Sequence, residues 1–260
     1  MRVIDPRRAL ACVGLTVISL WFTSMGTTKI NPKTVVAVWL LDEGQGKEVG
    51  DASGNGHDGA IKGAVKWAKG KFGNALEFPG NKEGVVKIPH KNSLSLVTMT
   101  LTAWIKISEL PDNIAPIYKG QGDLSNYAHR VWAGGFRPHQ YALEFTVGPA
   151  KWKSVTSRKI VVDGKWHHVA GTYDKKALRV YVDGVFQGEM AESGKPDLNP
   201  GAVLLGAKST KGILDELGVF NKALSEDQIK GIMKSGLDTV LVVSPKEKLP
   251  IVWGELKAKN

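Results

Sequence analysis

The chain has 260 residues, of which 42% are hydrophobic and 23% are charged, a composition that excludes an intrinsically disordered protein. Its single cysteine, Cys12, excludes a disulfide framework. The net charge is +10, but the lysines are scattered and no nucleic-acid-reading motif is present, so nucleic acid is not the expected partner and a diffuse basic surface favours acidic polysaccharides or anionic envelope surfaces.

Residues 1–26 have the features of an export signal. Basic residues precede an apolar stretch from Ala9 to Phe22, and the small residues Ser24 and Gly26 follow at a spacing that signal peptidases accept. The apolar stretch is shorter than the roughly 20 residues that span a bilayer. We therefore predict a signal peptide, membrane contact only through this segment, and a secreted, periplasmic or cell-surface location. An uncleaved anchor is the alternative.

From residue 34 onward, short strand-forming segments alternate with turns. In Met99–Ile107 every second residue is apolar, which is the period of a strand with one buried face. Asp183 and Gly184 suit a type I′ hairpin turn, because both central residues of that turn need a positive φ. The predicted strands are Val35–Leu41, Ala60–Trp67, Ala75–Phe78, Val85–Ile88, Met99–Ile107, Trp166–Tyr173, Leu178–Val182, Val185–Glu189, Val203–Leu205 and Leu214–Phe220.

One helix is predicted after the last of these strands. Ser225 and Gln228 form a capping box, an apolar stripe follows from Ile229 to Met233, and Gly236 can end the helix. Strands without alternating helices indicate antiparallel sheets. The predicted fold class is all-β: a two-sheet antiparallel sandwich with one short helix after the last long strand.

Five segments of the chain together resemble a known family. They are Val38–Gly59 (VWLLDEGQGKEVGDASGNGHDG), Gly73–Phe78 (GNALEF), Leu101–Lys106 (LTAWIK), Lys165–Gly188 (KWHHVAGTYDKKALRVYVDGVFQG) and Ile213–Ile232 (ILDELGVFNKALSEDQIKGI). In this order they resemble the laminin-G-like, concanavalin-A-like jelly-roll family.

The resemblance implies a jelly-roll domain over residues 34–236, with two curved sheets and a groove on one face. It leaves residues 237–260 as a C-terminal tail, for which an added edge strand and a tether are both open. It also implies frequent calcium and attachment roles, with glycans or cell-surface proteins as ligands.

A calcium site is the first candidate. Calcium takes about six to eight oxygen ligands, and the glycine-rich loop DASGNGHDG that begins at Asp51 offers side-chain and carbonyl oxygens. In related domains calcium commonly joins this loop to the last long strand, so the resemblance implies ligands at Asp42, Asp51, Asn55, Asp58 and Asp215. The alternative is that Asp51 and Asn55 only form Asx-turns.

A glycan site is the second candidate. Sugar sites combine aromatic faces with polar side chains, and the middle of the chain is rich in both. We predict Tyr127, Arg130 and Trp132 as exposed ligand-binding residues, although aromatic residues at strand spacing are more often core. The other candidates in this region are Tyr118, His129, His139, Tyr141 and Trp152.

Catalytic motifs are absent from the sequence. Glycoside hydrolases of this fold place two acids at alternate strand positions, whereas Asp215 and Glu216 are consecutive and would point to opposite faces. His167 and His168 are separated by the same alternation. We therefore predict a non-catalytic, calcium-stabilised binding module. A protein-binding adhesive module is the main alternative, and a glycoside hydrolase of the same fold is the other.

Overall fold

The computed structural model describes residues 29–121, 124–133, 138–148 and 150–241. The predicted signal peptide with Cys12, and residues 242–260 of the predicted tail, lie outside the described residues. No helix among the described residues is long and apolar enough to cross a membrane.

The described chain is built almost wholly of strands. They are β1 (Val35–Trp39), β2 (Glu48–Val49), β3 (Gly59–Lys62), β4 (Lys66–Lys69), β5 (Asn74–Pro79), β6 (Val85–Ile88), β7 (Met99–Lys106), β8 (Ala115–Gln121), β9 (Leu124–Val131), β10 (Gln140–Val147), β11 (Lys151–Ile160), β12 (Trp166–Tyr173), β13 (Ala177–Val182), β14 (Val185–Ala191), β15 (Val203–Ala207) and β16 (Lys211–Phe220). The helices are α1 (Glu226–Ser235) and α2 (Asp238–Leu241), with 3-10 turns at Pro32–Thr34 and Asn92–Leu94.

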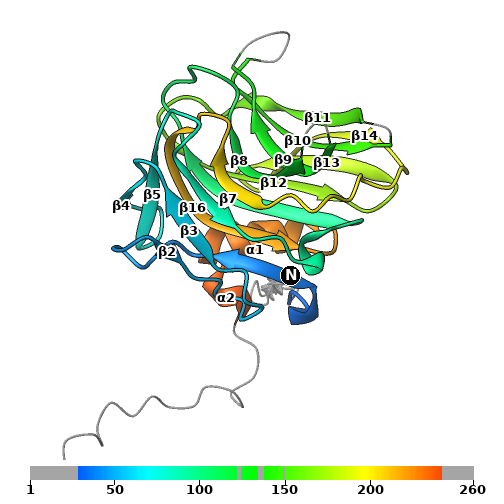
Figure 1. Ribbon diagram of the computed structural model, residues 1–260. Coiled ribbons are helices and arrows are strands. Elements are labelled where there is room, and N and C mark those ends of the chain that lie inside the picture. Colours follow the sequence, from blue (N-terminus) through cyan, green and yellow to red (C-terminus); the bar gives the residue numbers. More distant parts are fainter. Residues whose placement is uncertain (1–28, 122–123, 134–137, 149, 242–260) are drawn as a thin grey trace, which may run out of the picture.

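The strands form two eight-stranded sheets (Figure 1). The first, called the helix-side sheet, has the order β14-β13-β12-β7-β16-β5-β4, with β1 also paired to β16. The second, called the open sheet, has the order β11-β10-β9-β8-β15-β6-β3-β2. The named strands pair antiparallel throughout, so the predicted sandwich is confirmed.

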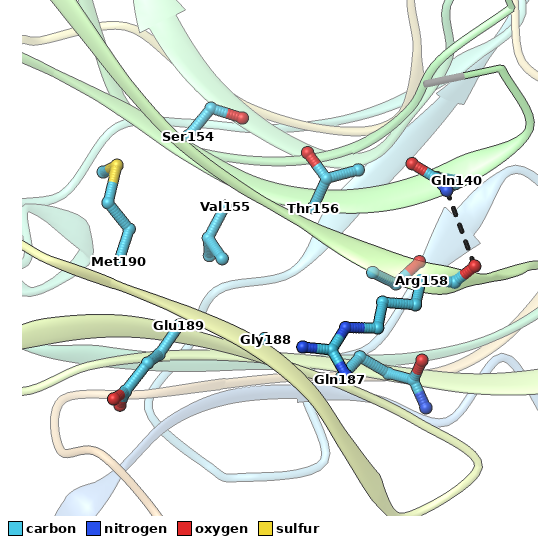
Figure 2. A pocket seen from close by; sticks show the side chains of 10 residues that line it. Gln140, Ser154, Val155, Thr156, Arg158, Gln187, Gly188, Glu189 and Met190 are labelled. Carbon is cyan, nitrogen blue, oxygen red and sulfur yellow. Dashed lines mark hydrogen bonds between the residues drawn. The ribbon is translucent and has the colours of Figure 1, made fainter. Parts of the chain in front are cut away.

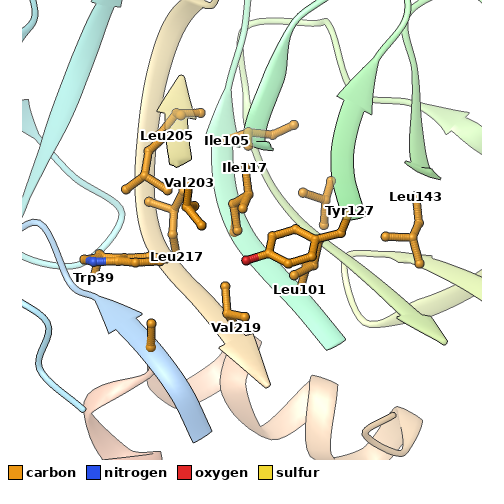
Figure 3. Close-up of a cluster of buried hydrophobic side chains, with 14 of the residues drawn as sticks. Trp39, Leu101, Ile105, Ile117, Tyr127, Leu143, Val203, Leu205, Leu217 and Val219 are labelled. Atoms are coloured by element: carbon orange, nitrogen blue, oxygen red, sulfur yellow. The ribbon is translucent and has the colours of Figure 1, made fainter. Parts of the chain in front are cut away.

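The main core lies between the inner faces of the two sheets (Figure 3). Leu101 and Val219 come from the helix-side sheet, and Ile117, Tyr127 and Leu143 come from the open sheet. Because successive side chains along a strand point to opposite faces, the residues next to these in the sequence face outward. What covers the two outer faces therefore decides where a ligand can bind.

Helix α1 covers part of the outer face of the helix-side sheet. Its predicted capping box is confirmed, since Ser225 Oγ accepts the Gln228 N–H and Gln228 Oε1 accepts the Ser225 N–H. Ile229 and Ile232 pack in a second apolar cluster with Tyr181 from β13. Among the described residues, no helix covers the outer face of the open sheet.

The predicted strands agree with the structure except in three places, of which the first is the short strand β2, which was not predicted. The segment Ala60–Trp67 is split into β3 and β4 by a turn that contains Gly63, whose φ is +66°. Strands β8–β11, which make half of the open sheet, were not among the predicted strands. The part of the predicted tail that is described packs on the domain, because Leu237 is fully buried beside α1.

Candidate functional site

The outer face of the open sheet gathers the polar and aromatic residues of the middle region. In the strand register, Ala128 of β9 lies between Tyr118 of β8 and Glu144 of β10, and Glu144 lies opposite Ser154 of β11. Directly paired residues share one face of a sheet. Their neighbours Ile117 and Leu143 point into the core, so these residues point outward.

Arg130 is the centre of this face. Its Nε lies 2.5 Å from Glu144 Oε2, and Ser154 Oγ donates to the other oxygen of Glu144 at 3.0 Å. Its guanidinium carbon lies 5.6 Å from the ring centroids of both Trp132 and Trp152, within the range of a cation–π contact. Hydrogen bonds and two aromatic rings therefore fix the guanidinium.

Two adjoining pockets meet at Arg130. The first, about 370 Å³, is lined by Arg130, Trp132, Glu144, Trp152 and Ser154. The second, about 470 Å³, lies on the other side of Arg130. It is lined by Lys82, Val85, Asp112, Asn113, Tyr118, Arg130, Leu204, Ala207 and Lys208.

The first pocket has the chemistry of a sugar site. Trp152 is 48% exposed although it is a large aromatic residue, so its ring is available to pack on the apolar face of a ligand. Arg130, Glu144 and Ser154 supply hydrogen-bond donors and acceptors at the same place. A fixed polar group flanked by aromatic faces can bind and orient a hydroxylated ligand.

The structure brings Arg130 and Trp132 together, but the predicted exposure is wrong for Tyr127 and for Arg130, which is only 9% exposed, while Trp132 is partly exposed. Tyr127 is fully buried in the main core, and burial raises the pKa of its hydroxyl. Tyr127 directly precedes the outward-facing Ala128 in β9, so its side chain points to the opposite face of the sheet, into the core. The sequence names Trp152 only among the further candidates for the glycan site. It does not single out Glu144 and Ser154, because their proximity to Arg130 depends on the register of β9–β11.

The five predicted calcium ligands fall into two groups. In the first, Asp215 Oδ2 accepts the N–H groups of Lys71 and Phe72 at 2.8 and 3.0 Å, and Asp42 Oδ1 accepts the Asn74 N–H at 2.8 Å. The turn between β4 and β5 thus lies against both carboxylates. Asp215 is fully buried, and burial, with Asp42 adding to it, raises the pKa of Asp215 to about 7.

In the second group, the glycine-rich loop uses its side chains on backbone groups. Asp51 accepts the N–H groups of Val38, Ser53 and His57. Asp58 Oδ1 accepts the Asp51 N–H at 2.7 Å.

Asn55 completes this second group by donating to the carbonyls of Val35 and Val36. In the described part of the chain, no group of three or more His, Cys, Asp or Glu side chains is placed to hold a metal ion.

Glu216 interrupts the strand alternation that the sequence predicts. It has a φ of +51°, and the register of β16 with β7 shifts between Asp215 and Gly218, which is a β-bulge. Its carboxylate accepts the Leu237 N–H, and burial, with Asp215 adding to it, raises its pKa to about 7. Both carboxylates are buried and bound to backbone, an arrangement unlike that of two acids facing an open groove.

The two histidines of β12 are separated, as expected. His167 lies between Asp183 Oδ2 at 2.9 Å and Asp163 Oδ1 at 3.1 Å. His168 is fully buried with its ring against Trp104, and burial lowers its pKa to about 4.

Another cleft, of about 550 Å³, lies where the edges of the two sheets meet (Figure 2). Its walls are β11 of the open sheet and β14 of the helix-side sheet, with Arg158 on one side and Glu189 on the other. None of its lining residues among those described is aromatic. The outer face of the open sheet is therefore the better candidate for a glycan.

Comparisons with known proteins agree with this fold. A family model described as the concanavalin A-like lectin/glucanases superfamily matches residues 79–230, more than half of the chain. No curated protein matches the chain.

Three solved structures illustrate the similarity. The binding domain of Paraclostridial Mosquitocidal Protein 1 has a TM-score of 0.65 at 13% identity over 78% of this chain. Domain 4 of AbnA, an extracellular arabinanase from Geobacillus stearothermophilus solved with arabinotriose, has a TM-score of 0.63 at 21% identity over 77%. The binding domain of botulinum neurotoxin serotype G has a TM-score of 0.62 at 11% identity over 77%.

These similarities cover different shares of the other chains. The match spans 52% and 50% of the two toxin binding domains but 98% of Domain 4. At these identities the similarity shows a shared fold.

Proposed function

This chain belongs to the concanavalin A-like lectin/glucanase superfamily, and from that premise we propose that it is a non-catalytic module that binds carbohydrate on the outer face of its open sheet. The observation that carries the proposal is the Trp132–Arg130–Trp152 arrangement with Glu144. A similar domain, Domain 4 of AbnA, was solved with arabinotriose, which supports a sugar as the ligand class. The toxin neighbours are binding domains, which supports binding rather than catalysis.

The physical case rests on Trp152. Exposing half of an indole ring to water forgoes the hydrophobic stabilisation that burying it would give, at about 25 cal/mol per Å². A sugar ring that packs on this indole would recover that stabilisation. Arg130 is already fixed by Glu144, so little side-chain entropy would be lost when it binds a hydroxyl group.

The test is binding of Trp152→Ala to a glycan array, followed by titration calorimetry with the best ligand. We expect the variant to bind about five- to thirtyfold more weakly, because stacking on one aromatic face is worth about 1–2 kcal/mol. The matched control is Phe186→Ala, which removes a 43% exposed aromatic side chain from β14 of the other sheet.

The outcomes separate the alternatives. Equal binding by the wild type and both variants would place the sugar elsewhere on the molecule. If no glycan binds the wild type while a cell-surface protein does, the adhesive alternative replaces this proposal. Release of reducing sugar from a bound glycan would contradict a non-catalytic role.

We also propose that calcium stabilises the domain at Asp215 and Asp42. Asp215 Oδ1 is buried without a hydrogen-bond partner among the described residues, so this oxygen is available to a cation. A Cβ on Gly70 or Gly73 would come within 2.6 Å of one of these carboxylates, so the turn backbone lies close to both. Backbone carbonyls would have to complete the ligand set.

Melting curves test the calcium proposal. We expect a melting temperature higher by about 5 °C in millimolar calcium than in chelator, because calcium at about 100 times its Kd stabilises by about 2.7 kcal/mol. Asp215→Asn should abolish the difference. Asp58→Asn, in the loop whose side chains bind backbone groups, should leave it intact. Identical wild-type curves with and without calcium would remove the proposal.

Residues 1–26 support the further proposal that the protein is exported. Mass spectrometry of the protein recovered outside the cytoplasm tests it: a mature chain starting near residue 27 is the expected result, and a full-length chain retained in the cytoplasm contradicts it.

A further inference from the structure

We propose that the second pocket beside Arg130 binds the anionic group of an acidic oligosaccharide, a carboxylate or a sulfate ester, whose neighbouring sugar occupies the tryptophan pocket. This inference rests on the proposed glycan site and names its ligand class. The two pockets share Arg130, so one chain of sugars can lie across both.

The lysines that line the second pocket are free to bind an anion. Within the described residues, neither Lys82 nor Lys208 has a carboxylate within 4 Å, whereas Lys211, three residues further along, is paired with Glu109. Lys208 Nζ lies 5.4 Å from the ring centroid of Tyr118, a cation–π contact between two residues that both line the pocket.

The other charges around the pocket do not cancel these two lysines. Arg130 is neutralised by Glu144 at 2.5 Å, so this pair contributes no net charge. Asp112 is the remaining charged residue of the lining and is exposed. Two lysines against one aspartate leave the pocket positive, which favours an anionic ligand.

The backbone around Lys208 points to the same conclusion. Lys208 and Ser209 have φ values of +61° and +64°, so both central residues of the turn between β15 and β16 adopt the left-handed conformation. The hairpin turn between β13 and β14 also has two positive φ values, but there they fall on Asp183 and Gly184, residue types that this geometry favours. A lysine in a conformation that favours Asn or Gly, at the rim of a pocket, is the kind of strain found at ligand-binding positions.

The test compares matched pairs of polysaccharides in affinity gels and calorimetry. Polygalacturonate is compared with its fully methyl-esterified form, and dextran sulfate with dextran, so that the two members of each pair share a sugar backbone and differ in charge. We expect the charged member of at least one pair to bind at least about tenfold more tightly, with an affinity that falls as salt rises. The pair that shows the preference identifies carboxylate or sulfate.

Variants locate the effect. Lys208→Gln and Lys82→Gln should each weaken binding of the acidic ligand about fivefold, the effect of one lost charge pair. Lys66→Gln is the matched control, because it removes the same charge from β4 at the edge of the helix-side sheet. Trp152→Ala should weaken both members of each pair.

Each result has one meaning. Tighter binding of an acidic ligand that depends on Lys208 and Lys82 but not on Lys66 supports the inference. Equal binding of charged and uncharged forms, lost in Trp152→Ala, overturns the acidic ligand class and leaves the glycan site standing. An equal effect of all three lysine variants means a diffuse charge effect and also overturns it. Failure of every glycan to bind overturns both proposals.

Discussion

At the scale of single residues, the ion pairs Arg130–Glu144 and Arg179–Glu189 differ in how far their side chains are exposed to water. The side chains of the first pair are 11% and 3% exposed, whereas Glu189 in the second is 55% exposed. Removing one partner from a buried pair leaves the other charge without compensation, while exposed pairs contribute little. The same two residue types on neighbouring strands therefore have different energetic roles.

We expect Glu144→Ala to lower the free energy of unfolding by about 2–3 kcal/mol, somewhat less than a fully buried pair, because Arg130 keeps some contact with water. Glu189→Ala, the control, should cost less than about 1 kcal/mol. Urea denaturation measures both. Equal losses in the two variants would show that burial does not set the strength of the first pair.

Residue by residue, the sequence predicted only part of the proposed binding face. Arg130 and Trp132 were predicted because charged and aromatic residues are crowded there, yet the same signal selected Tyr127, which is part of the core. Tyr127 and Arg130 are three residues apart on β9, so their side chains point to opposite faces of the sheet. Predicting which face is the outer one requires the bounds and register of β9. Glu144 reaches Arg130 only through the pairing of β10 with β9, which composition does not reveal.

At the scale of elements, the turn between β15 and β16 carries a cost. Each L-residue held in the left-handed conformation costs about 1–2 kcal/mol, and Lys208 and Ser209 are both in it. Glycine relieves this strain, although its larger entropy in the unfolded chain returns part of the gain.

We therefore expect Ser209→Gly to stabilise the protein by up to about 1 kcal/mol without changing the affinity for acidic glycans. Lys208→Gly should stabilise it by a similar amount but weaken that affinity about fivefold, since it removes the charge. Urea denaturation and calorimetry on the same samples give both quantities. Destabilisation by Ser209→Gly would contradict the assignment of strain to this turn.

Elements with a regular pattern were predicted well, and the others were not. Strand β12 and the capped helix α1 agree with the sequence because alternation and capping are local signals. Strands β8–β10 were missed because both of their faces are largely buried, which hides the alternation, whereas β11 is exposed or half-buried at most positions and has few apolar residues to alternate. The bulge at Glu216 was missed because the residue with the positive φ is a glutamate and not a glycine.

At the scale of the whole molecule, buried histidine makes stability depend on pH. His129 lies in the interior with its ring against Tyr141, and burial, with His168 adding to it, lowers the pKa of His129 to about 3. Its folded pKa is below the unfolded value of about 6.5, so the unfolded chain takes up the proton first. His129 therefore favours the folded state above pH 6.5, and this contribution is lost as the pH falls.

Between pH 7 and pH 4 we expect His129 alone to lower the free energy of unfolding by roughly 3 kcal/mol. Asp215 and Glu216 act in the opposite direction, because their raised pKa values favour the folded state as the pH falls. The diagnostic quantity is thus the difference between wild type and His129→Phe, which keeps a ring against Tyr141. This difference, measured by urea denaturation, should shift by that amount between the two pH values. Parallel profiles would contradict it.

The placement of β15 and β16 has a consequence for how the chain folds. Each sheet has one of these late strands inside it: β15 lies between β6 and β8, and β16 lies between β5 and β7 while also pairing with β1. Neither sheet can close until residues 203–220 are available, so the loop-closure entropy of nearly the whole domain is lost before the central contacts form. Topologies with such distant contacts fold on a scale of about milliseconds to seconds, and until then the edges of β5–β8 stay open to pairing with other chains.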